Sequence, residues 1–475
     1  MDDFRDALDI AGNWVADYWE KDSAKYPVLS QVSPGQIRNS LPVYPPIQAE
    51  TFERIWADFQ QIILPGVTHW NHPGFFAYFS ITGSPPGMVA ELLSAALNIN
   101  GMLWKTCPAS TELEEVVLDW LRRMLGIPSP LFGIIMDTAS VGTFCALAAA
   151  RESLGLRIRE DGMAGRSDLP RLRVYCSEHT HSSIDKAVIA LGLGLNGLRK
   201  IMVDSEFRMI PEALDEAIHQ DLASGWKPAA VVATVGTTST SSIDPVQEVL
   251  DVCRKHRVWL HVDAAYAGSA AILPEMQWIL KGCDQADSFL LNPHKWMFVP
   301  FDCTAFYTRH PDLLQQAFSL VPEYLRTGEQ GIHDFMNYGI QLGRRFRALK
   351  LWMVIRCYGV SGLQKVLRNH ISLAQEFAGW IRDSADFELS APTPFSLVCF
   401  RAKPAGWPDG DLDRLNETLM NNINRTGEVY LSHTKLNGQI VLRLAIGNMK
   451  TALPHVTRVW ELLQAELPAL KSHGV

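Results

Sequence analysis

The sequence has no long hydrophobic run, no block of basic residues and no Cys-x-x-Cys pair. No apolar segment approaches the roughly 20 residues that a membrane-spanning helix needs, and the acidic start Met1-Asp2-Asp3 is unlike a signal peptide. Because the formal net charge is -8, we expect neither nucleic acid nor a membrane as a partner. The eight cysteines are scattered, which favours free thiols in a cytoplasmic protein over disulfides or structural zinc.

Length and composition indicate a globular enzyme with more than one domain. The chain has 475 residues, of which 47% are hydrophobic and 20% are charged. A single hydrophobic core stops growing well below this length. We expect an N-terminal helical arm over residues 1–80, a large α/β domain over 81–360 and a small α+β domain over 361–475.

The arm opens with a predicted amphipathic helix over residues 2–21. Five apolar residues recur at helical spacing and form one stripe: Phe4, Leu8, Ala11, Val15 and Tyr18. A proline-rich connection follows over residues 27–46. Such an arm has little core of its own, so it packs either on another subunit or on its own chain.

An aromatic segment follows at residues 68–79, which include Trp70, Tyr78 and Phe79. This segment is either a loop collapsed onto a core or an aromatic wall against a flat substrate. His69 and His72 lie close together in the sequence, but nothing else there resembles a metal site. We therefore predict no metal ion.

Two helices are predicted next, at residues 86–98 and 111–125. The second has Thr111 and Glu114 at the spacing of a capping box, which predicts its start. The connection between them carries large side chains, among them Met102 and Trp104.

From about residue 130 to 310, short apolar strands alternate with helices, as in a mostly parallel sheet flanked by helices. Strands are predicted at residues 132–136, 173–176, 229–235, 258–262 and 288–291. The polar residues that follow them, in chain order, are Thr138 with Ser140, His181, Thr238, Asp263 and Lys295. Since ligands bind at the carboxyl ends of parallel strands, we expect these residues to share one site.

Each of these residues has a second explanation when taken alone. Thr138 and Ser140 could cradle a phosphate at a helix N-terminus, but both residue types are also ordinary helix caps. His181 could stack on a ring or transfer a proton, although a histidine after a strand is usually structural. Asp263 follows an apolar strand, so its carboxylate needs a cationic partner or strong hydrogen bonds.

Lys295 lies in the segment Asn292-Pro293-His294-Lys295-Trp296, directly after a buried strand. A lone lysine is usually exposed. An amine that is partly desolvated at this place has a lowered pKa and becomes a nucleophile. A phosphate cradle, a partner for a protonated pyridine, a ring-stacking histidine and an imine-forming lysine together predict one cofactor, pyridoxal phosphate.

The remaining third of the chain combines a long polar loop with a mixed domain. Residues 321–341 show little periodicity, and such loops are usually functional or disordered. A helix is predicted from Gly343 to about residue 358 and another over 362–383. Strands at 396–400, 428–431 and 440–445, with helices at 410–423 and 454–466, predict a small α+β domain.

These motifs resemble the group II pyridoxal-phosphate decarboxylases, most closely the aromatic-L-amino-acid decarboxylases, over nearly the whole chain. The resemblance is carried by the sequences at residues 69–79, 110–114, 181–183, 261–268, 292–296, 343–347 and 442–447. It departs at Ser80-Ile81, where many relatives have Pro-Thr or Pro-Ser, and at Thr138, where animal relatives have Ser.

The resemblance implies a fold-type I homodimer whose site lies at the subunit interface. It implies that Lys295 forms the imine, Asp263 pairs with the pyridinium and His181 stacks on the cofactor. Further implied cofactor contacts are Thr138, Ala139, Ser140, Thr238, Ala265, Asn292 and His294. Implied substrate contacts are Trp70, Tyr78, Phe79, Met102, Trp104 and Gly343.

Tyr324 falls on the family's catalytic tyrosine, and members with Phe there resemble aldehyde synthases. We therefore expect pyridoxal-phosphate-dependent decarboxylation of tryptophan, 5-hydroxytryptophan, tyrosine, dopa or phenylalanine. The alternatives are an aromatic aldehyde synthase, another group II decarboxylase such as histidine decarboxylase, an aminotransferase, or a non-catalytic binding protein. An aromatic pocket without an extra arginine argues against glutamate as a substrate.

Overall fold

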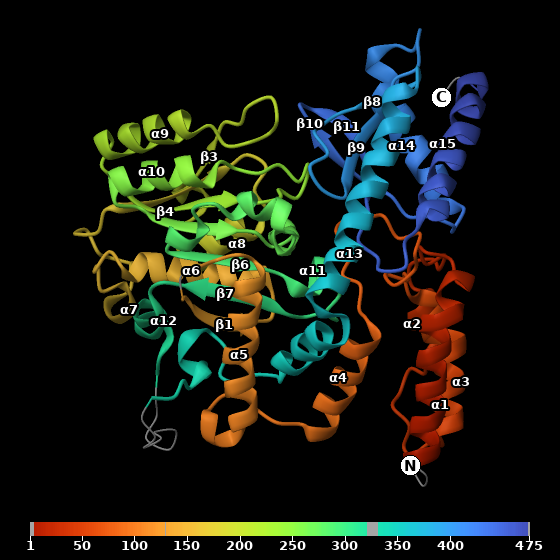
Figure 1. Cartoon of the computed structure of the whole chain (residues 1–475), viewed down its shortest axis with the longest axis horizontal. Helices are drawn as coiled ribbons and strands as arrows, with labels where there is room; N and C mark the ends of the chain where they lie inside the picture. Colours follow the sequence, from red (N-terminus) through yellow and green to blue (C-terminus); the bar gives the residue numbers. More distant parts are fainter. Residues whose placement is uncertain (1–3, 129, 321–330, 474–475) are drawn as a thin grey trace. The chain divides into compact units, whose positions relative to one another are not determined.

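The computed structural model describes residues 4–128, 130–320 and 331–473 (Figure 1). The chain divides into two compact units. The first comprises Met1–Ser80, His370–Ser390 and Ser396–Val475, and the second comprises Ile81–Asn369 and Ala391–Phe395. The division into an arm, a large domain and a small domain, with boundaries near 80 and 360, stays a prediction.

The second unit contains a seven-stranded sheet in the order β1-β7-β6-β5-β4-β2-β3. Of these strands, β7 alone runs opposite to the other six. The mostly parallel sheet that the sequence predicts is therefore confirmed. The strands are β1 (Phe132–Met136), β2 (Arg171–Ser177), β3 (Leu198–Ile201), β4 (Trp226–Thr234), β5 (Trp259–Asp263), β6 (Ser288–Leu291) and β7 (Thr304–Thr308).

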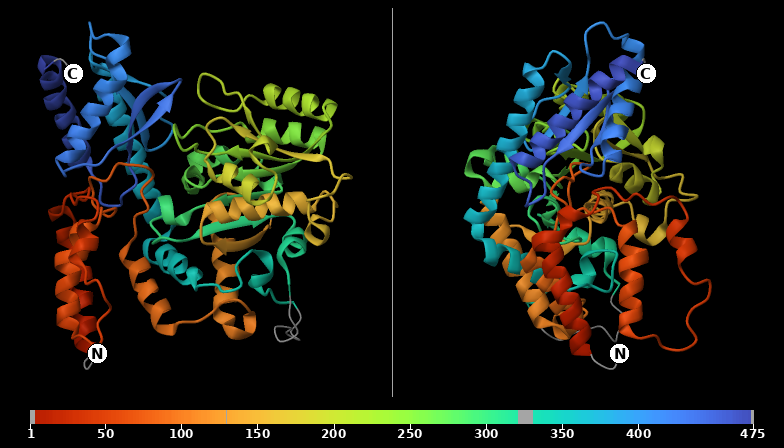
Figure 2. Two further views of the ribbon diagram at one scale, coloured as in Figure 1. Left: turned by 180° about the vertical axis from the view of Figure 1, so that it is seen from behind. Right: turned by 90° about the vertical axis from the view of Figure 1, so that its right-hand side faces the viewer.

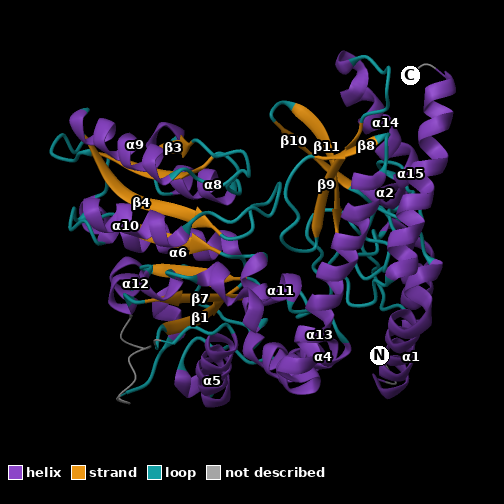
Figure 3. Ribbon diagram, turned by 45° about the horizontal axis from the view of Figure 1, so that its top comes forward, coloured by secondary structure: helices purple, strands orange, loops and turns teal. Residues whose placement is uncertain are grey.

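Helices flank this sheet, as Figure 3 shows. The α-helices of the second unit are α4 (Pro85–Leu97), α5 (Pro108–Met124), α6 (Ala139–Glu152), α7 (Ile158–Asp161), α8 (Ser183–Ala190), α9 (Pro211–Ala223), α10 (Val246–His256), α11 (Pro293–Trp296), α12 (Pro311–Phe318) and the first part of α13 (Arg347–Asp383). The core between sheet and helices includes six consecutive buried residues of the alanine-rich α6, Cys145–Ala150. Small side chains let α6 approach the strands closely: a Cβ on Gly142 would lie 2.8 Å from Leu290 Cδ2.

The first unit contains a four-stranded antiparallel sheet in the order β10-β11-β9-β8. Its elements are α1 (Phe4–Asp17), α2 (Gln36–Ser40), α3 (Phe52–Asp58), β8 (Phe387–Leu389), β9 (Leu397–Ala402), α14 (Leu412–Arg425), β10 (Ser432–Leu436), β11 (Gln439–Ala445) and α15 (Leu453–His473). Its core joins β8, β9 and β11 to α14, α15 and the last part of α13. This sheet is the small C-terminal sheet that the sequence predicts.

Helices α1 and α3 lie side by side in both views of Figure 2. Trp14 of α1 contacts Phe59, with ring centroids 5.4 Å apart, and Trp56 at 6.1 Å. The predicted apolar stripe of α1 is not covered: Phe4 is 69% exposed, and Leu8 and Val15 are exposed as well. None of the helices in the described residues has an apolar stretch that could span a bilayer.

Three local predictions were wrong. Helix α5 begins at Pro108, so Thr111 and Glu114 lie inside the helix and do not cap it. Residues 428–431 form no strand; Tyr430 makes only an isolated bridge with Phe75. The helix expected from Gly343 begins at Arg347.

The segment just before α13 is tied to a distant loop. The Arg344 backbone N–H donates to Asn100 Oδ1 at 2.9 Å. Farther along, α13 is interrupted at Gly359, which has φ +63°. This break separates the two helices that the sequence predicts at this place.

Candidate active site

The strand ends that precede the predicted site residues meet at one edge of the large sheet. Strands β1 and β6 both pair antiparallel with β7, while β6, β5, β4 and β2 pair in parallel, so these five strands run in the same direction. In sheet order, the residues that end or follow them are Thr138, Lys295, Asp263, Thr238 and His181. The topology therefore gathers hydroxyl, amine, carboxylate and imidazole groups along one edge.

Asp263 and Lys295 form the charged centre of this edge. Asp263 is 4% exposed, and its Oδ1 accepts a hydrogen bond from the Ala265 backbone N–H at 3.0 Å. Burial lowers the pKa of the Lys295 amine, and the Asp263 carboxylate opposes that shift. Since β5 pairs Asp263 with Leu290, one residue before the end of β6, the carboxylate lies beside the turn that carries Lys295.

The turn that carries Lys295 is held by packing. Lys295 lies in the four-residue helix α11, whose Trp296 is fully buried. Trp296 stacks on Tyr266, with ring centroids 5.0 Å apart. An amine on such an anchored turn is pre-positioned, and its lowered pKa increases the fraction of the neutral, nucleophilic form.

His181 is oriented by the residue two positions later. The Ser183 backbone N–H donates to His181 Nδ1 at 3.1 Å, and Ser183 Oγ lies 2.9 Å from the same nitrogen. Although His181 keeps solvent exposure, desolvation of its ring lowers its pKa, while Asp263 opposes that change. A neutral ring whose Nδ1 accepts a hydrogen bond carries its proton on Nε2.

Thr138 occupies the N-cap position of α6, but its side chain makes no capping hydrogen bond to the described residues of that helix. Its backbone N–H donates to Asp137 Oδ1 at 2.7 Å. Ala139 is partly buried and Ser140 is exposed in the first turn. The first-turn N–H groups and the two hydroxyls are groups of the kind that could hold a phosphate, and their role as a cradle stays a prediction.

Asn292 ties together the turns after β5 and β6. Its backbone N–H donates to the Ala265 carbonyl at 3.1 Å. Its Oδ1 accepts a hydrogen bond from Thr304 Oγ1 at 2.8 Å, and the residue is 2% exposed. The predicted cofactor contacts Asn292 and Ala265 thus belong to one hydrogen-bonded unit.

His294 is buried beside this unit. Its Nδ1 accepts a hydrogen bond from the Cys303 backbone N–H at 2.9 Å. Burial, reinforced by the charge of Lys295, lowers the pKa of His294 to about 3. The ring is therefore neutral and fastens the turn, and its contact with a cofactor stays a prediction.

Thr238 is exposed at the end of a tight turn after β4. Gly236 in this turn has φ +88°, and a Cβ there would lie 2.5 Å from the Ala267 Cβ. Thr237 Oγ1 and Thr240 Oγ1 lie 2.9 Å apart beneath it. In this turn the hydroxyls of Thr237 and Thr240 are hydrogen-bonded to each other, whereas Thr238 is exposed to solvent at the sheet edge.

The predicted substrate residues of the first unit form an aromatic group. Trp70 stacks on Tyr78 and Phe75, with ring centroids 5.8 and 4.4 Å apart. The Tyr78 hydroxyl lies 3.0 Å from the hydroxyl of Tyr430. Phe79 is buried, and the Arg443 guanidinium lies over its ring at 5.3 Å. This segment is thus a packed aromatic surface with Tyr78 half-exposed.

Two of the predicted substrate residues of the second unit, Met102 and Gly343, lie beside Asn100. Asn100 Nδ2 donates to Met102 Sδ at 3.5 Å, and a Cβ on Gly343 would lie 3.8 Å from that same nitrogen. Trp104 Nε1 donates to Glu112 Oε1 at 2.9 Å. Met102 and Gly343 are therefore neighbours although they are far apart in the sequence.

Asp137 connects this group to the strand edge. Gln341 Nε2 donates to Asp137 Oδ2 at 2.8 Å, while Asp137 Oδ1 accepts the Thr138 N–H. The segment with Gly343 thus lies next to the candidate phosphate cradle. Tyr324 lies outside the described residues.

Sequence reasoning missed the residues that support the site. Ser183, which lies in the segment 181–183 that carries part of the resemblance, orients His181. A serine two residues after a histidine could have indicated such an orienting hydrogen bond. Thr304, the first residue of β7, holds Asn292, and Cys303, the residue just before β7, holds His294. No local sequence pattern indicates that these residues become neighbours.

Comparison with known proteins places the chain in a family. Residues 34–403 match the pyridoxal-dependent decarboxylase conserved domain. Tryptophan decarboxylase 2 of Oryza sativa subsp. japonica is 42% identical over 96% of this chain and 92% of its own length. Phenylacetaldehyde synthase of a Rosa hybrid cultivar is 38% identical over 99% of this chain and 95% of its own length.

A solved structure, that of Oryza sativa TDC with PLP and tryptamine, is similar over 99% of this chain and 98% of that chain, with a TM-score of 0.94 and 37% identity. The family match and these full-length similarities agree with the edge described above, which holds the Lys295 amine, the Asp263 carboxylate and the candidate phosphate cradle. The chain belongs to the family of pyridoxal-dependent decarboxylases.

Proposed function

We propose that this protein removes carbon dioxide from aromatic L-amino acids and releases the corresponding arylalkylamine, with pyridoxal phosphate as its cofactor. The observation that carries the proposal is the Lys295 amine of lowered pKa, fixed beside buried Asp263 at the sheet edge. The names of the rice and rose relatives, and the tryptamine in the rice structure, support an aromatic substrate. The preferred substrate is one of tryptophan, 5-hydroxytryptophan, tyrosine, dopa or phenylalanine.

Pyridoxal phosphate, when bound, supplies an electron sink for the bond that breaks as carbon dioxide leaves. Lys295 would hold the cofactor covalently through Nζ until the substrate amine replaces it. Asp263 would keep a proton on the ring nitrogen, because a buried carboxylate is stabilised by a cationic partner. Lys295 would thus attach the cofactor, and Asp263 would stabilise the positive charge on its ring nitrogen.

Thr138, Ala139 and Ser140 at the N-terminus of α6 would bind the phosphate through N–H and hydroxyl groups. Neutral His181, held by Ser183, would stack on the ring face. Thr238, Ala265, Asn292 and His294 would shape the remaining cofactor contacts. Tyr324 would return a proton to the α-carbon.

The aromatic group with Trp70, Tyr78 and Phe79, and the group with Met102, Trp104 and Gly343, would line the substrate side. Aromatic surfaces suit a flat ring because rings stack on rings. No arginine is among these predicted contacts, which disfavours an acidic side chain in the substrate.

We further infer a homodimer with the site at the interface. Apolar residues exposed on α1 and α4 support this: Phe4, Leu8, Val15, Val89, Leu92, Leu93 and Leu97. Light scattering coupled to gel filtration would give the mass of the assembly, and a monomer at working concentration would contradict the inference.

A cytoplasmic location is also proposed. All eight cysteines are described and unpaired, and six of them are buried, as fits a reducing compartment. Cell fractionation with antibody detection would test the location, and recovery from a secreted fraction would contradict it.

The function is tested by incubating the purified enzyme with a panel of aromatic amino acids and scoring amine, carbon dioxide and peroxide. Amine and carbon dioxide in equal amounts, without peroxide, are expected. The second candidate, an aromatic aldehyde synthase, is favoured by the name of the rose relative. It predicts aldehyde with stoichiometric peroxide, and histidine used better than any aromatic amino acid would instead favour histidine decarboxylase.

A further inference from the structure

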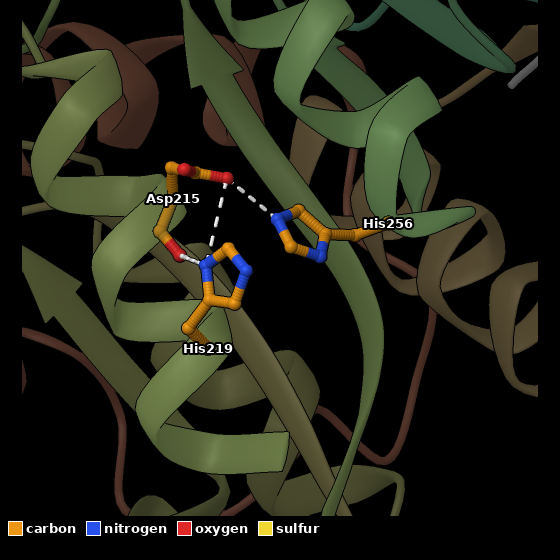
Figure 4. A group of neighbouring side chains, drawn as sticks. All are labelled: Asp215, His219 and His256. Carbon is orange, nitrogen blue, oxygen red and sulfur yellow. Dashed lines mark hydrogen bonds and ion pairs between the residues drawn. The ribbon is translucent and has the colours of Figure 1, made fainter. Parts of the chain in front are cut away.

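Asp215, His219 and His256 form a cluster that contains none of the predicted site residues (Figure 4). Asp215 and His219 lie one turn apart on α9, and His256 ends α10. Helices α9 and α10 pack against each other and against β4. The cluster therefore joins two helices of the second unit through side chains of ligating type.

The ligand atoms already face one another. His256 Nε2 lies 2.6 Å from Asp215 Oδ1, and His219 Nδ1 lies 3.8 Å from the same oxygen. Each residue offers one ligand atom, and the three atoms lie within 4.8 Å of one another. In a tetrahedral zinc site, metal–ligand bonds of about 2.0–2.2 Å place neighbouring ligand atoms about 3.4 Å apart. The observed separations bracket that value, so shifts of less than an ångström or so complete the geometry.

The solvent exposure of two of the three side chains leaves room for such a shift. The His219 side chain is 52% exposed and the Asp215 side chain 28% exposed, whereas that of His256 is only 7% exposed. His256 thus supplies a fixed ligand, and the other two can adjust to a cation. His219 Nδ1 also lies 3.0 Å from the Asp215 carbonyl oxygen, a contact that ligation would replace.

We propose that Asp215, His219 and His256 bind one divalent transition-metal cation of the Zn²⁺ class and that this cation links α9 to α10. Two imidazoles and one carboxylate suit Zn²⁺, while Ca²⁺ and Mg²⁺ need more oxygen ligands than this cluster offers. Solvent supplies the fourth ligand. The site is structural, since it contains no predicted cofactor or substrate contact.

Lys255 competes with the cation for Asp215. Its Nζ lies 2.9 and 2.8 Å from the two carboxylate oxygens. Its side chain is 55% exposed, so it can turn into solvent when a cation arrives. Binding therefore exchanges the ammonium group of Lys255 for a metal ion on the same carboxylate, and removing Lys255 should strengthen metal binding.

The test is calorimetric titration of Zn²⁺ into the tag-free holoenzyme. The wild type is expected to bind one Zn²⁺ at this site, and His219→Ala and Asp215→Asn are expected to lose that binding event. The matched control is His310→Ala, because His310 Nε2 also pairs with a carboxylate, Asp287, at 2.9 Å, but no third ligand joins them among the described residues. His310→Ala should keep the wild-type titration curve.

A second variant tests the exchange of cations. Lys255→Gln should bind Zn²⁺ more tightly than the wild type. Zn²⁺ should therefore raise the Tm of this variant by more than it raises the Tm of the wild type, because a ligand of the native state stabilises that state. Unchanged Zn²⁺ binding in both His219→Ala and Asp215→Asn would overturn the proposal, as would equal loss in His310→Ala. Weaker binding in Lys255→Gln would also overturn it.

Discussion

Arg344 Nη2 donates a hydrogen bond to Glu114 Oε1 at 2.7 Å, and both side chains are buried. The same carboxylate oxygen accepts the Ile135 backbone N–H at 2.7 Å, and Arg344 Nη2 also donates to the Ile135 carbonyl at 2.7 Å. One ion pair thus fastens α5 to β1 and to the segment with Gly343. It supports both the candidate phosphate cradle and the candidate substrate wall.

Replacing Glu114 with Gln should lower the free energy of unfolding by about 3 kcal/mol, because it leaves the Arg344 charge buried without a counter-ion. Denaturant unfolding measures this change. The control is Glu275→Gln, which breaks an exposed ion pair with Arg368 and should lower the unfolding free energy far less, because solvent screens an exposed pair. Equal effects of the two substitutions would show that the buried pair contributes no special stability.

Lys295→Ala should abolish steady turnover and remove the visible-range absorbance of bound cofactor. Burial lowers the pKa of this amine, and the Asp263 carboxylate acts on it. Spectra and amine release measure the two effects, and Lys186→Ala, an exposed neighbour on α8, serves as the control. A borohydride-reducible covalent adduct in Lys295→Ala would show that another lysine carries the cofactor.

His370 makes the protein sensitive to acid. It is fully buried, its Nε2 lies 3.0 Å from the Asn448 carbonyl oxygen, and burial lowers its pKa to about 4. Because the unfolded chain binds this proton near pH 6.5, the unfolded state takes up more protons below that pH. The stability linked to His370 is therefore complete above pH 6.5 and is lost as pH falls through about 4.

His370→Gln keeps an N–H donor but cannot titrate. Between pH 6.5 and pH 4, the wild type should lose about 3 kcal/mol more unfolding free energy than this variant. Denaturant unfolding at several pH values gives the difference. The control is His433→Gln, a change at an exposed position of β10; parallel pH profiles for the wild type and His370→Gln would contradict the assignment.

The strand ends were predictable because the sequence shows both the apolar run of each strand and the polar residue that follows it. Asp263 ends β5 and Lys295 follows β6 by local order alone, and parallel pairing then brings them to one edge. The Thr111 and Glu114 pattern failed for the opposite reason. The partner of Glu114 is Arg344, 230 residues away, and no local pattern can show that a carboxylate has a distant cation.

The same limit explains other differences. Residues 428–431 have strand-like composition, yet Tyr430 bridges Phe75 and the ladder begins at Ser432. Tertiary contacts decided that boundary, since strand propensity depends on the neighbours that are available. The neighbourhood of Met102 and Gly343 likewise depends on Asn100, whose side chain contacts both segments. Only the folded chain reveals it.

Gly343→Ser should narrow the range of substrates. A Cβ at Gly343 meets only the Asn100 side chain, at 3.8 Å, so the fold can accept the substitution. If Gly343 lines the pocket beside Met102, the added hydroxymethyl group takes space that a large indole ring needs. The kcat/KM ratio of tryptophan to tyrosine should then fall by about tenfold.

Steady-state kinetics on both substrates measures this ratio. Gly339→Ser is the matched control, because among the described residues a Cβ there meets only Cys145 Sγ, at 4.0 Å, and the position is not a predicted contact. A ratio that stays at the parental value in Gly343→Ser would place Gly343 outside the pocket.

Tyr324→Phe should change the product of the reaction. After carbon dioxide leaves, the α-carbon must receive a proton, and a phenol that delivers it also limits the time during which oxygen can react. Phenylalanine keeps the ring but has no proton to give. The variant should therefore form less amine and more aldehyde, ammonia and peroxide, which is the outcome that the resemblance implies for relatives with Phe at this position.

The measurement is a complete product balance under air and under nitrogen. Oxygen is needed for the aldehyde route, so nitrogen should suppress aldehyde and peroxide in Tyr324→Phe without restoring the parental rate of amine formation. Tyr44→Phe, which removes the hydroxyl of an exposed tyrosine, should leave the balance unchanged under both gases. If Tyr324→Phe makes amine at the parental rate without peroxide, the proton comes from another group, and His181, whose Nε2 carries a proton while Ser183 holds Nδ1, becomes the donor to test next.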